Sequence, residues 1–153
     1  MNSQRVGRPI QILLVEDNPG DARLTLEALK DGKIQNRLYI VNSGMEAIAF
    51  LRRKGKYADA PNPDFILLDL NMPLMNGSQL LAEVKQDLAL KHIPVAILTG
   101  SQAAEDIARA YNLHADCYVT KPIDLEEFIM AVKSIVDSLL NQREIADGGR
   151  VIG

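Results

Sequence analysis

The sequence predicts an α/β fold in which a parallel sheet of five strands carries helices on both faces. Five short apolar segments recur along the chain, and each precedes a stretch with the periodicity of an amphipathic helix. Three of them, QILLVED, DFILLDL and PVAILTG, are almost wholly apolar, which is typical of strands that crossover helices bury on both faces. With 153 residues, the chain has room for one hydrophobic core.

The segments define both the strands and the limits of the domain. The predicted strands are residues 10–15, 37–41, 65–69, 93–99 and 115–120. We expect an N-terminal arm at 1–9, one domain at 10–140, and a Gly-rich polar tail at 141–153 that frays.

Capping residues mark the helices between these strands. Asn18 precedes a proline, and Ser43 and Asp124 are each followed three residues later by glutamate, the spacing of a capping box. Gly32 and Gly55 are expected to mark the ends of the first two helices.

The last predicted helix has a broader apolar stripe than packing on a small sheet requires. Part of it is therefore expected to face a partner. The stripe consists of Leu125, Phe128, Ile129, Val132, Ile135, Val136, Leu139 and Leu140.

Composition and charge argue against several classes of function. The formal net charge is -3 and no long run of like charges occurs, so we expect no nucleic-acid partner and no membrane partner. Cys117 is the single cysteine, which excludes an intramolecular disulfide and favours a reducing compartment. Without a long apolar segment, the chain is predicted to be cytoplasmic.

Acidic residues follow two of the predicted strands. Glu16 and Asp17 come after the first strand, and Asp69 closes the third. In the flavodoxin-like strand order 2-1-3-4-5 these strands are neighbours, so the carboxylates converge and need a cation. Oxygen ligands alone favour Mg²⁺. A favourable interaction with a helix dipole, worth about 0.3 to 1 kcal/mol for each carboxylate, could explain why acidic residues occur at positions 16 and 17. It does not explain Asp69.

Two further residues lie at strand ends on the same edge. Thr99 closes the fourth strand, and Lys121 follows the fifth. A cation, a hydroxyl and a lysine beside a carboxylate can hold a phosphoryl group, and an aspartate can itself be the nucleophile. Taken singly, a capping threonine and a solvated lysine would be the simpler interpretations. Five such residues at strand ends favour a site.

The motifs VEDN, LLDLNMPLMNG, ILTG and YVTKP, in this order, resemble those of the receiver domain of two-component response regulators. The resemblance covers about residues 10–140 and includes the spacing from Asp69 to Thr99 to Lys121. It implies that Asp69 is the phosphoacceptor, that Thr99 and Lys121 grip the phosphoryl group, and that Tyr118 is an aromatic switch. It also implies Mg²⁺ ligation by Asp69, by Asp17, by Glu16 through water, and by the main-chain carbonyl of Asn71.

Two features narrow the resemblance. The connection LRRKGKYADAPNPD, of which residues 54–64 are predicted as a loop, is long, and the chain stops after the fifth helix. Both are similar to the small response regulators of bacterial phytochromes, especially in cyanobacteria. The resemblance implies a sensor histidine kinase, a phytochrome, as partner. It also implies output in trans and a homodimer formed through the fourth helix, fifth strand and fifth helix.

Two other functions fit the residues at this edge less well than a signalling switch does. A metal-dependent phosphatase that forms an aspartyl phosphate generally needs a second acid near the nucleophile, but Leu70 and Asn71 follow Asp69. A nucleotide or flavin binder would need a Gly-rich or Ser/Thr-rich phosphate loop after the first strand, where Glu16 and Asp17 stand instead. We therefore expect a phosphoacceptor protein and not an enzyme.

Overall fold

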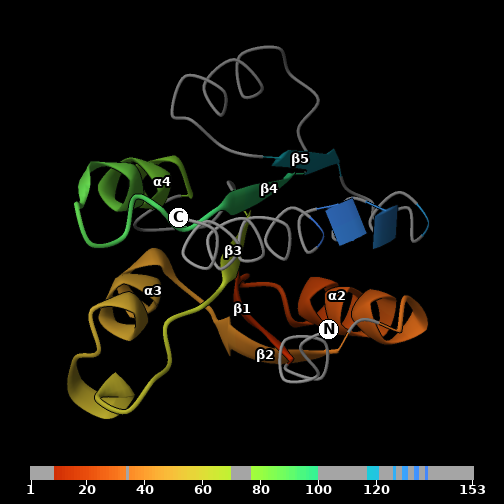
Figure 1. Cartoon of the computed structure of the whole chain (residues 1–153), viewed down its shortest axis with the longest axis horizontal. Helices are drawn as coiled ribbons and strands as arrows, with labels where there is room; N and C mark the ends of the chain where they lie inside the picture. Colours follow the sequence, from red (N-terminus) through yellow and green to blue (C-terminus); the bar gives the residue numbers. More distant parts are fainter. Residues whose placement is uncertain are drawn as a thin grey trace, which may run out of the picture.

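The computed structural model contains a parallel sheet with helices on both faces (Figure 1). The strand order is β2-β1-β3-β4-β5, and every neighbouring pair is parallel, which confirms the predicted order. The structure describes residues 9–33, 35–69, 77–99 and 117–120, with six helical residues further on: Glu126, Ile129, Met130, Lys133, Ser134 and Asp137.

The strands agree closely with the predicted segments. Their bounds are β1 (Ile10–Val15), β2 (Asn36–Val41), β3 (Phe65–Asp69), β4 (Val95–Thr99) and β5 (Cys117–Thr120). β4 begins later than predicted because Ile93 lies in a turn, where its N–H donates to the Leu90 carbonyl at 3.0 Å. Ile93 is nevertheless buried, so its apolar character reflects core packing and not a place in the strand.

Two of the helices begin where their capping residues predicted. The helical elements are α2 (Pro19–Asp31), α3 (Gly44–Leu51), η1 (Gly55–Tyr57) and α4 (Gly77–Gln86). The Asn18 side chain accepts a hydrogen bond from the Asp21 N–H at 3.0 Å, and the Ser43 hydroxyl accepts one from Glu46 N–H at 3.1 Å. Each bond satisfies an N–H group that has no partner inside the helix. The predicted cap at Asp124 lies outside the described residues.

The prediction that Gly55 follows the end of α3 was wrong. The helix ends before Arg53, which adopts a φ of 54°. The N–H groups of Arg53 and Lys54 donate to the Phe50 and Ala49 carbonyls at 3.2 and 2.9 Å. These two bonds form a Schellman motif, so an arginine occupies the left-handed position that glycine usually takes. Gly55 instead opens η1, a short helix inside the segment predicted as a loop.

Gly32 does cap α2, for a reason that the sequence did not indicate. Its φ is -76°, while the next residue, Lys33, takes the left-handed conformation with a φ of 56°. A Cβ on Gly32 would lie 3.0 Å from the Ile129 side chain. Glycine therefore provides space for the last helical segment.

Two apolar clusters lie on opposite faces of the sheet. Alternate residues of β1 divide between them, with Leu13 and Val15 on the α3 and α4 face and Ile12 and Leu14 on the α2 face. β3 is buried along its whole length, as its apolar sequence predicted. This two-sided core holds the carboxyl ends of β1 and β3 side by side. Within the described part of the chain, no helix is long and apolar enough to cross a bilayer.

Candidate functional site

Three acidic residues converge at the carboxyl edge of the sheet, as predicted. Val15 of β1 pairs with Leu68 of β3, which sets the residues that follow them next to each other. Glu16, Asp17 and Asp69 can each direct a carboxylate oxygen so that all three oxygens lie within 4.8 Å of one another. The register of two neighbouring parallel strands therefore creates the cluster.

The three carboxylates differ in their exposure. Glu16 is 2% exposed and Asp69 is 5% exposed, whereas Asp17 is exposed to solvent. The Glu16 N–H donates to the Val41 carbonyl at 2.9 Å, and its Oε2 accepts from the Asn18 N–H at 3.4 Å. The loop between β1 and α2 is thus held at both ends, and the same Asn18 caps the helix.

This arrangement fits a hard divalent cation. Charged carboxylates that lie close together repel one another, and burial makes the repulsion stronger because the surrounding dielectric is low. A cation with oxygen ligands relieves that repulsion, and Mg²⁺ commonly takes one or two carboxylates while keeping several waters. Stabilisation by a helix dipole cannot replace it at Asp69, which ends β3 and does not begin a described helix.

The other predicted site residues are only partly described. Thr99 ends β4, one residue beyond Leu98, which pairs with Asp69, so its backbone lies at the same edge. Tyr118 lies in β5 opposite Ile97. Asn71 and Lys121, together with the other residues directly after β3 and β5, lie outside the described residues.

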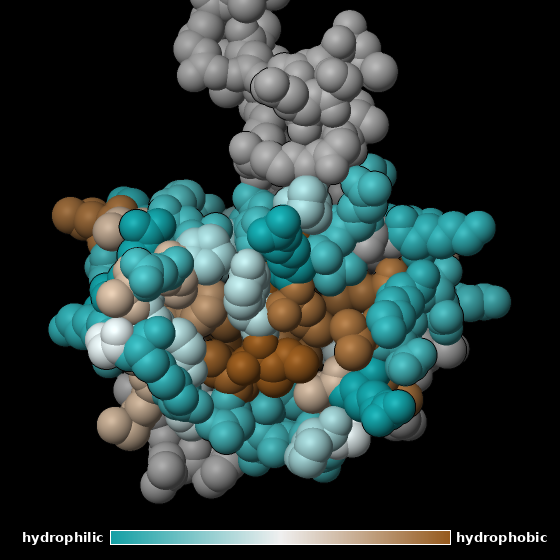
Figure 2. Space-filling model, turned by 90° about the horizontal axis from the view of Figure 1, so that it is seen from below, coloured by the Kyte–Doolittle hydropathy of each residue, from teal (hydrophilic) through white to brown (hydrophobic). Residues whose placement is uncertain are grey.

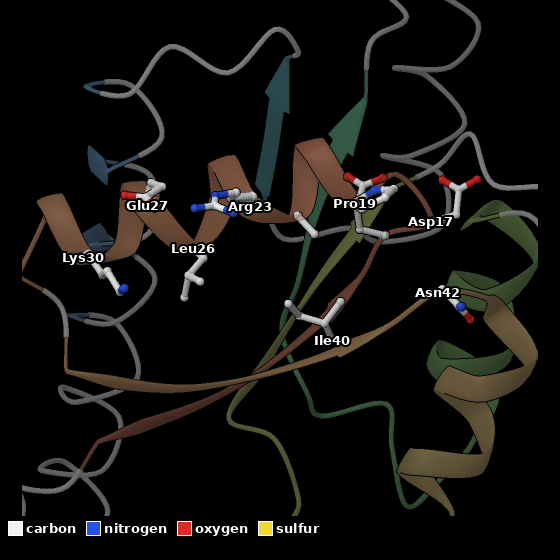
Figure 3. A pocket seen from close by; sticks show the side chains of 10 residues that line it. Asp17, Pro19, Arg23, Leu26, Glu27, Lys30, Ile40 and Asn42 are labelled. Carbon is white, nitrogen blue, oxygen red and sulfur yellow. The ribbon is translucent and has the colours of Figure 1, made fainter.

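A groove of about 620 Å³ runs from this edge between α2 and β2, and the sequence did not indicate it. Figure 3 shows Leu26 and Ile40 facing each other across it, with Asp17 at one end and Lys30 near the other. The one indication of this groove is Ile40, an exposed apolar residue in the edge strand β2. The lining residues are Glu16, Asp17, Pro19, Ala22, Arg23, Leu26, Glu27, Lys30, Ile40 and Asn42.

A second cluster of titratable groups fixes the long connection that precedes β3. The Tyr57 hydroxyl donates to Glu46 Oε1 at 2.9 Å, and the Lys56 ammonium lies 3.0 Å from the same oxygen. These contacts from Lys56 and Tyr57 lower the pKa of Glu46, while burial and the Glu46 charge raise the pKa of Tyr57. The Tyr57 ring contacts Phe50, which in turn contacts Tyr39. The connection is thereby tied to α3 and β2.

Comparison with known proteins identifies the relatives of this chain. It is 45% identical to response regulator Rcp1 from Synechocystis over 127 residues, which cover 83% of this chain and 86% of that protein. The structure of Rcp1 with Mn²⁺ bound superposes with a TM-score of 0.73, covering 83% of this chain and 91% of Rcp1.

Two phytochrome response regulators of known structure are also similar. The phosphorylated cyanobacterial phytochrome response regulator RcpA is 41% identical, with a TM-score of 0.73 over 90% of this chain and 94% of RcpA. The bacteriophytochrome response regulator RtBRR is 38% identical, with a TM-score of 0.76 over 84% of this chain and 78% of RtBRR. Residues 12–133 match the response regulator receiver domain family. The chain therefore belongs to the response regulator receiver domains and is related to those of phytochromes.

Proposed function

We propose that Asp69 accepts a phosphoryl group from a phosphohistidine of a sensor kinase, with Mg²⁺ as the metal. The observation that carries this proposal is the position of the Asp69 carboxylate, whose oxygen comes within 4.8 Å of those of Glu16 and Asp17 at the edge of the sheet. Asp69 therefore lies beside the two other proposed metal ligands and also at the end of a rigid, buried strand.

The proposed reaction transfers the phosphoryl group from nitrogen to oxygen. A carboxylate oxygen of Asp69 attacks the phosphorus, the bond from phosphorus to the histidine nitrogen breaks, and an acyl phosphate forms on Asp69. When bound, Mg²⁺ supplies positive charge that neutralises the phosphoryl oxygens. Glu16 and Asp17 would hold it with Asp69, and the main-chain carbonyl of Asn71 completes the proposed ligand set.

The signal would then pass from the phosphoryl group to the surface of the protein. We assign Thr99 and Lys121 the binding of the phosphoryl oxygens, and Tyr118 the role of switch. The affected surface comprises the predicted fourth helix, which falls between β4 and β5 and lies outside the described residues, together with β5 and the last helix. There we expect homodimerisation and output in trans. Met130 of the last helix, which is 71% exposed, supports an apolar partner surface there.

A phytochrome is the kinase we propose as donor. Rcp1, RcpA and RtBRR support it, because two of them are named as phytochrome response regulators and all three cover most of this chain. The alternative, a phosphatase, finds no support among these relatives, and we propose no catalytic turnover. A cytoplasmic location agrees with a single cysteine, Cys117.

Phosphotransfer profiling tests the proposal directly. The purified chain is incubated with Mg²⁺ and a panel of autophosphorylated sensor kinases, one of them a phytochrome, and transfer is followed at early times. We expect a base-labile, hydroxylamine-sensitive phosphate that arrives fastest from the phytochrome. Asp69→Asn should stay folded and unlabelled, whereas Asp59→Asn, which alters an exposed loop acid, should be labelled normally. Phosphate that persists in Asp69→Asn would contradict the phosphoacceptor assignment.

A further inference from the structure

β2 forms one edge of the sheet, and within the described residues β1 is its only strand partner. Most edge strands avoid pairing with other chains through prolines, bulges or charges. β2 has the sequence NRLYIV, which contains no proline and one charged residue, Arg37. Its Ile40 side chain is 49% exposed. Among the residues that the structure describes, nothing pairs with the outer side of β2, so this edge can accept an additional strand.

The groove beside this edge combines an apolar floor with an apolar wall. Ile40 contributes from β2, and Ala22 and Leu26 contribute from α2 (Figure 3). Figure 2 views the molecule from the β2 side and shows apolar side chains in the middle of that face, surrounded by polar ones. An occupant of the groove would bury Leu26 and Ile40 further.

The charges along the groove are arranged with opposite signs at its two ends. Asp17 lies at the carboxyl end of the strands, and Lys30 lies one α2 length away, near their amino end. Between them, Arg23 and Glu27 stand four residues apart on the same wall. A two-fold axis that crosses α2 at right angles through its middle places the acidic end of one copy opposite the basic end of the other. It also places Arg23 of each copy opposite Glu27 of the other. The groove is therefore complementary in charge to itself.

We infer that a second copy of this chain occupies the groove. The β2 strands of the two copies run antiparallel to each other, and the sheet continues across the two-fold axis. Arg23 of each copy faces Glu27 of the other, and each Asp17 end lies toward a Lys30 end. Such an interface uses the same patch twice, as two-fold dimers do. It lies at the opposite edge of the sheet from β5 and does not depend on phosphate at Asp69.

Sedimentation equilibrium of the unphosphorylated full chain in Mg²⁺ tests the inference. The wild-type protein and Asp69→Asn should show the same concentration-dependent dimer. Ile40→Lys should weaken it by about tenfold for each copy, hence about a hundredfold in the dissociation constant, because the interface contains the residue twice. Leu88→Lys is the matched control, since Leu88 is 82% exposed in the turn between α4 and β4. It should leave the dimer unchanged.

A charge swap distinguishes this dimer from one formed elsewhere. Glu27→Arg places like charges opposite each other and should weaken the dimer, whereas Arg23→Glu combined with Glu27→Arg should restore it. Urea unfolding of each variant verifies that the monomer is intact. A monomeric wild-type chain, or a dimer that neither Ile40→Lys nor Glu27→Arg weakens, would overturn the inference. Neither result affects phosphotransfer to Asp69, so the two proposals fail separately.

Discussion

The carboxylates of Glu16 and Asp69 come within 4.8 Å of each other although both residues are almost completely buried. Glu16 follows β1 and Asp69 ends β3, so the pairing of these two strands brings the two carboxylates close together. Two acidic side chains in such a place raise the energy of the folded chain unless positive charge is supplied. Folding and metal binding are therefore expected to be coupled at this edge of the sheet.

Mg²⁺ should stabilise the folded protein, because the three carboxylates meet only when the sheet has formed. At a concentration of 100 times the dissociation constant, a single site adds about 2.7 kcal/mol to the free energy of unfolding. Asp17→Asn should remove most of this gain, and Asp59→Asn should not. Thermal unfolding with and without Mg²⁺ measures the effect. A melting temperature that Mg²⁺ does not change would contradict the metal site.

Asp69→Asn should stabilise the protein in the absence of divalent cations. The substitution removes one of three neighbouring negative charges, and the repulsion between charges at about this distance is on the order of 1 to 4 kcal/mol. The same substitution should greatly reduce the stabilisation by Mg²⁺. Urea unfolding in EDTA, compared with wild type, measures the change. A less stable Asp69→Asn protein in EDTA would show that repulsion is not the dominant interaction there.

The contacts of Glu46 with Lys56 and Tyr57 should make stability depend on acid pH. Because the pKa of Glu46 is lower in the folded chain than its ordinary value, the unfolded chain binds more protons as the pH falls. The stabilisation is thus present above the ordinary glutamate pKa of about 4.3 and is lost as the pH falls through the lower folded pKa.

Two substitutions test these contacts of Glu46. Tyr57→Phe removes the hydroxyl and should cost about 0.5 to 1.5 kcal/mol at neutral pH. Glu46→Gln should reduce the loss of stability on acidification, while Glu126→Gln, at an exposed helical position, should keep it. Urea unfolding from neutral pH to about pH 3 gives both quantities. An acid dependence that Glu46→Gln leaves unchanged would assign it to other carboxyl groups.

Substitutions at Thr99 and Tyr118 should separate phosphorylation from output. Thr99→Ala should still accept phosphate, because positioning and charge neutralisation at Asp69 suffice for transfer. It loses a hydrogen bond worth about 1.5 to 3 kcal/mol, against about 5.5 kcal/mol for a full shift between two states. The active population of the phosphorylated protein should therefore fall severalfold. Tyr118→Ala should behave in the same way.

Labelling stoichiometry and phosphorylation-dependent association, measured on the same samples, provide the readout for these two variants. Asp69→Asn gives the value without phosphate. If Thr99→Ala associates like wild type at equal labelling, the switch operates through other residues.

The amino-acid sequence by itself determined the strands, the starts of two helices and the acidic residues that meet at the edge of the sheet. Apolar runs specified β1, β3 and the core of β4, and Asn18 and Ser43 specified where helices begin, because strand burial and helix capping are local demands on residue type. The order of the strands then placed Glu16, Asp17 and Asp69 at one edge. These are consequences of chain periodicity and of parallel topology.

Only the tertiary structure decided what surrounds those elements. Arg53, and not Gly55, takes the left-handed conformation at the end of α3. Gly32 makes room for Ile129, and Tyr57 reaches Glu46 across a long connection. The groove between α2 and Ile40 likewise arises from how far one helix covers an edge strand. Each depends on packing between segments distant in sequence, where residue type fixes what is possible and the position of the neighbouring element decides what forms.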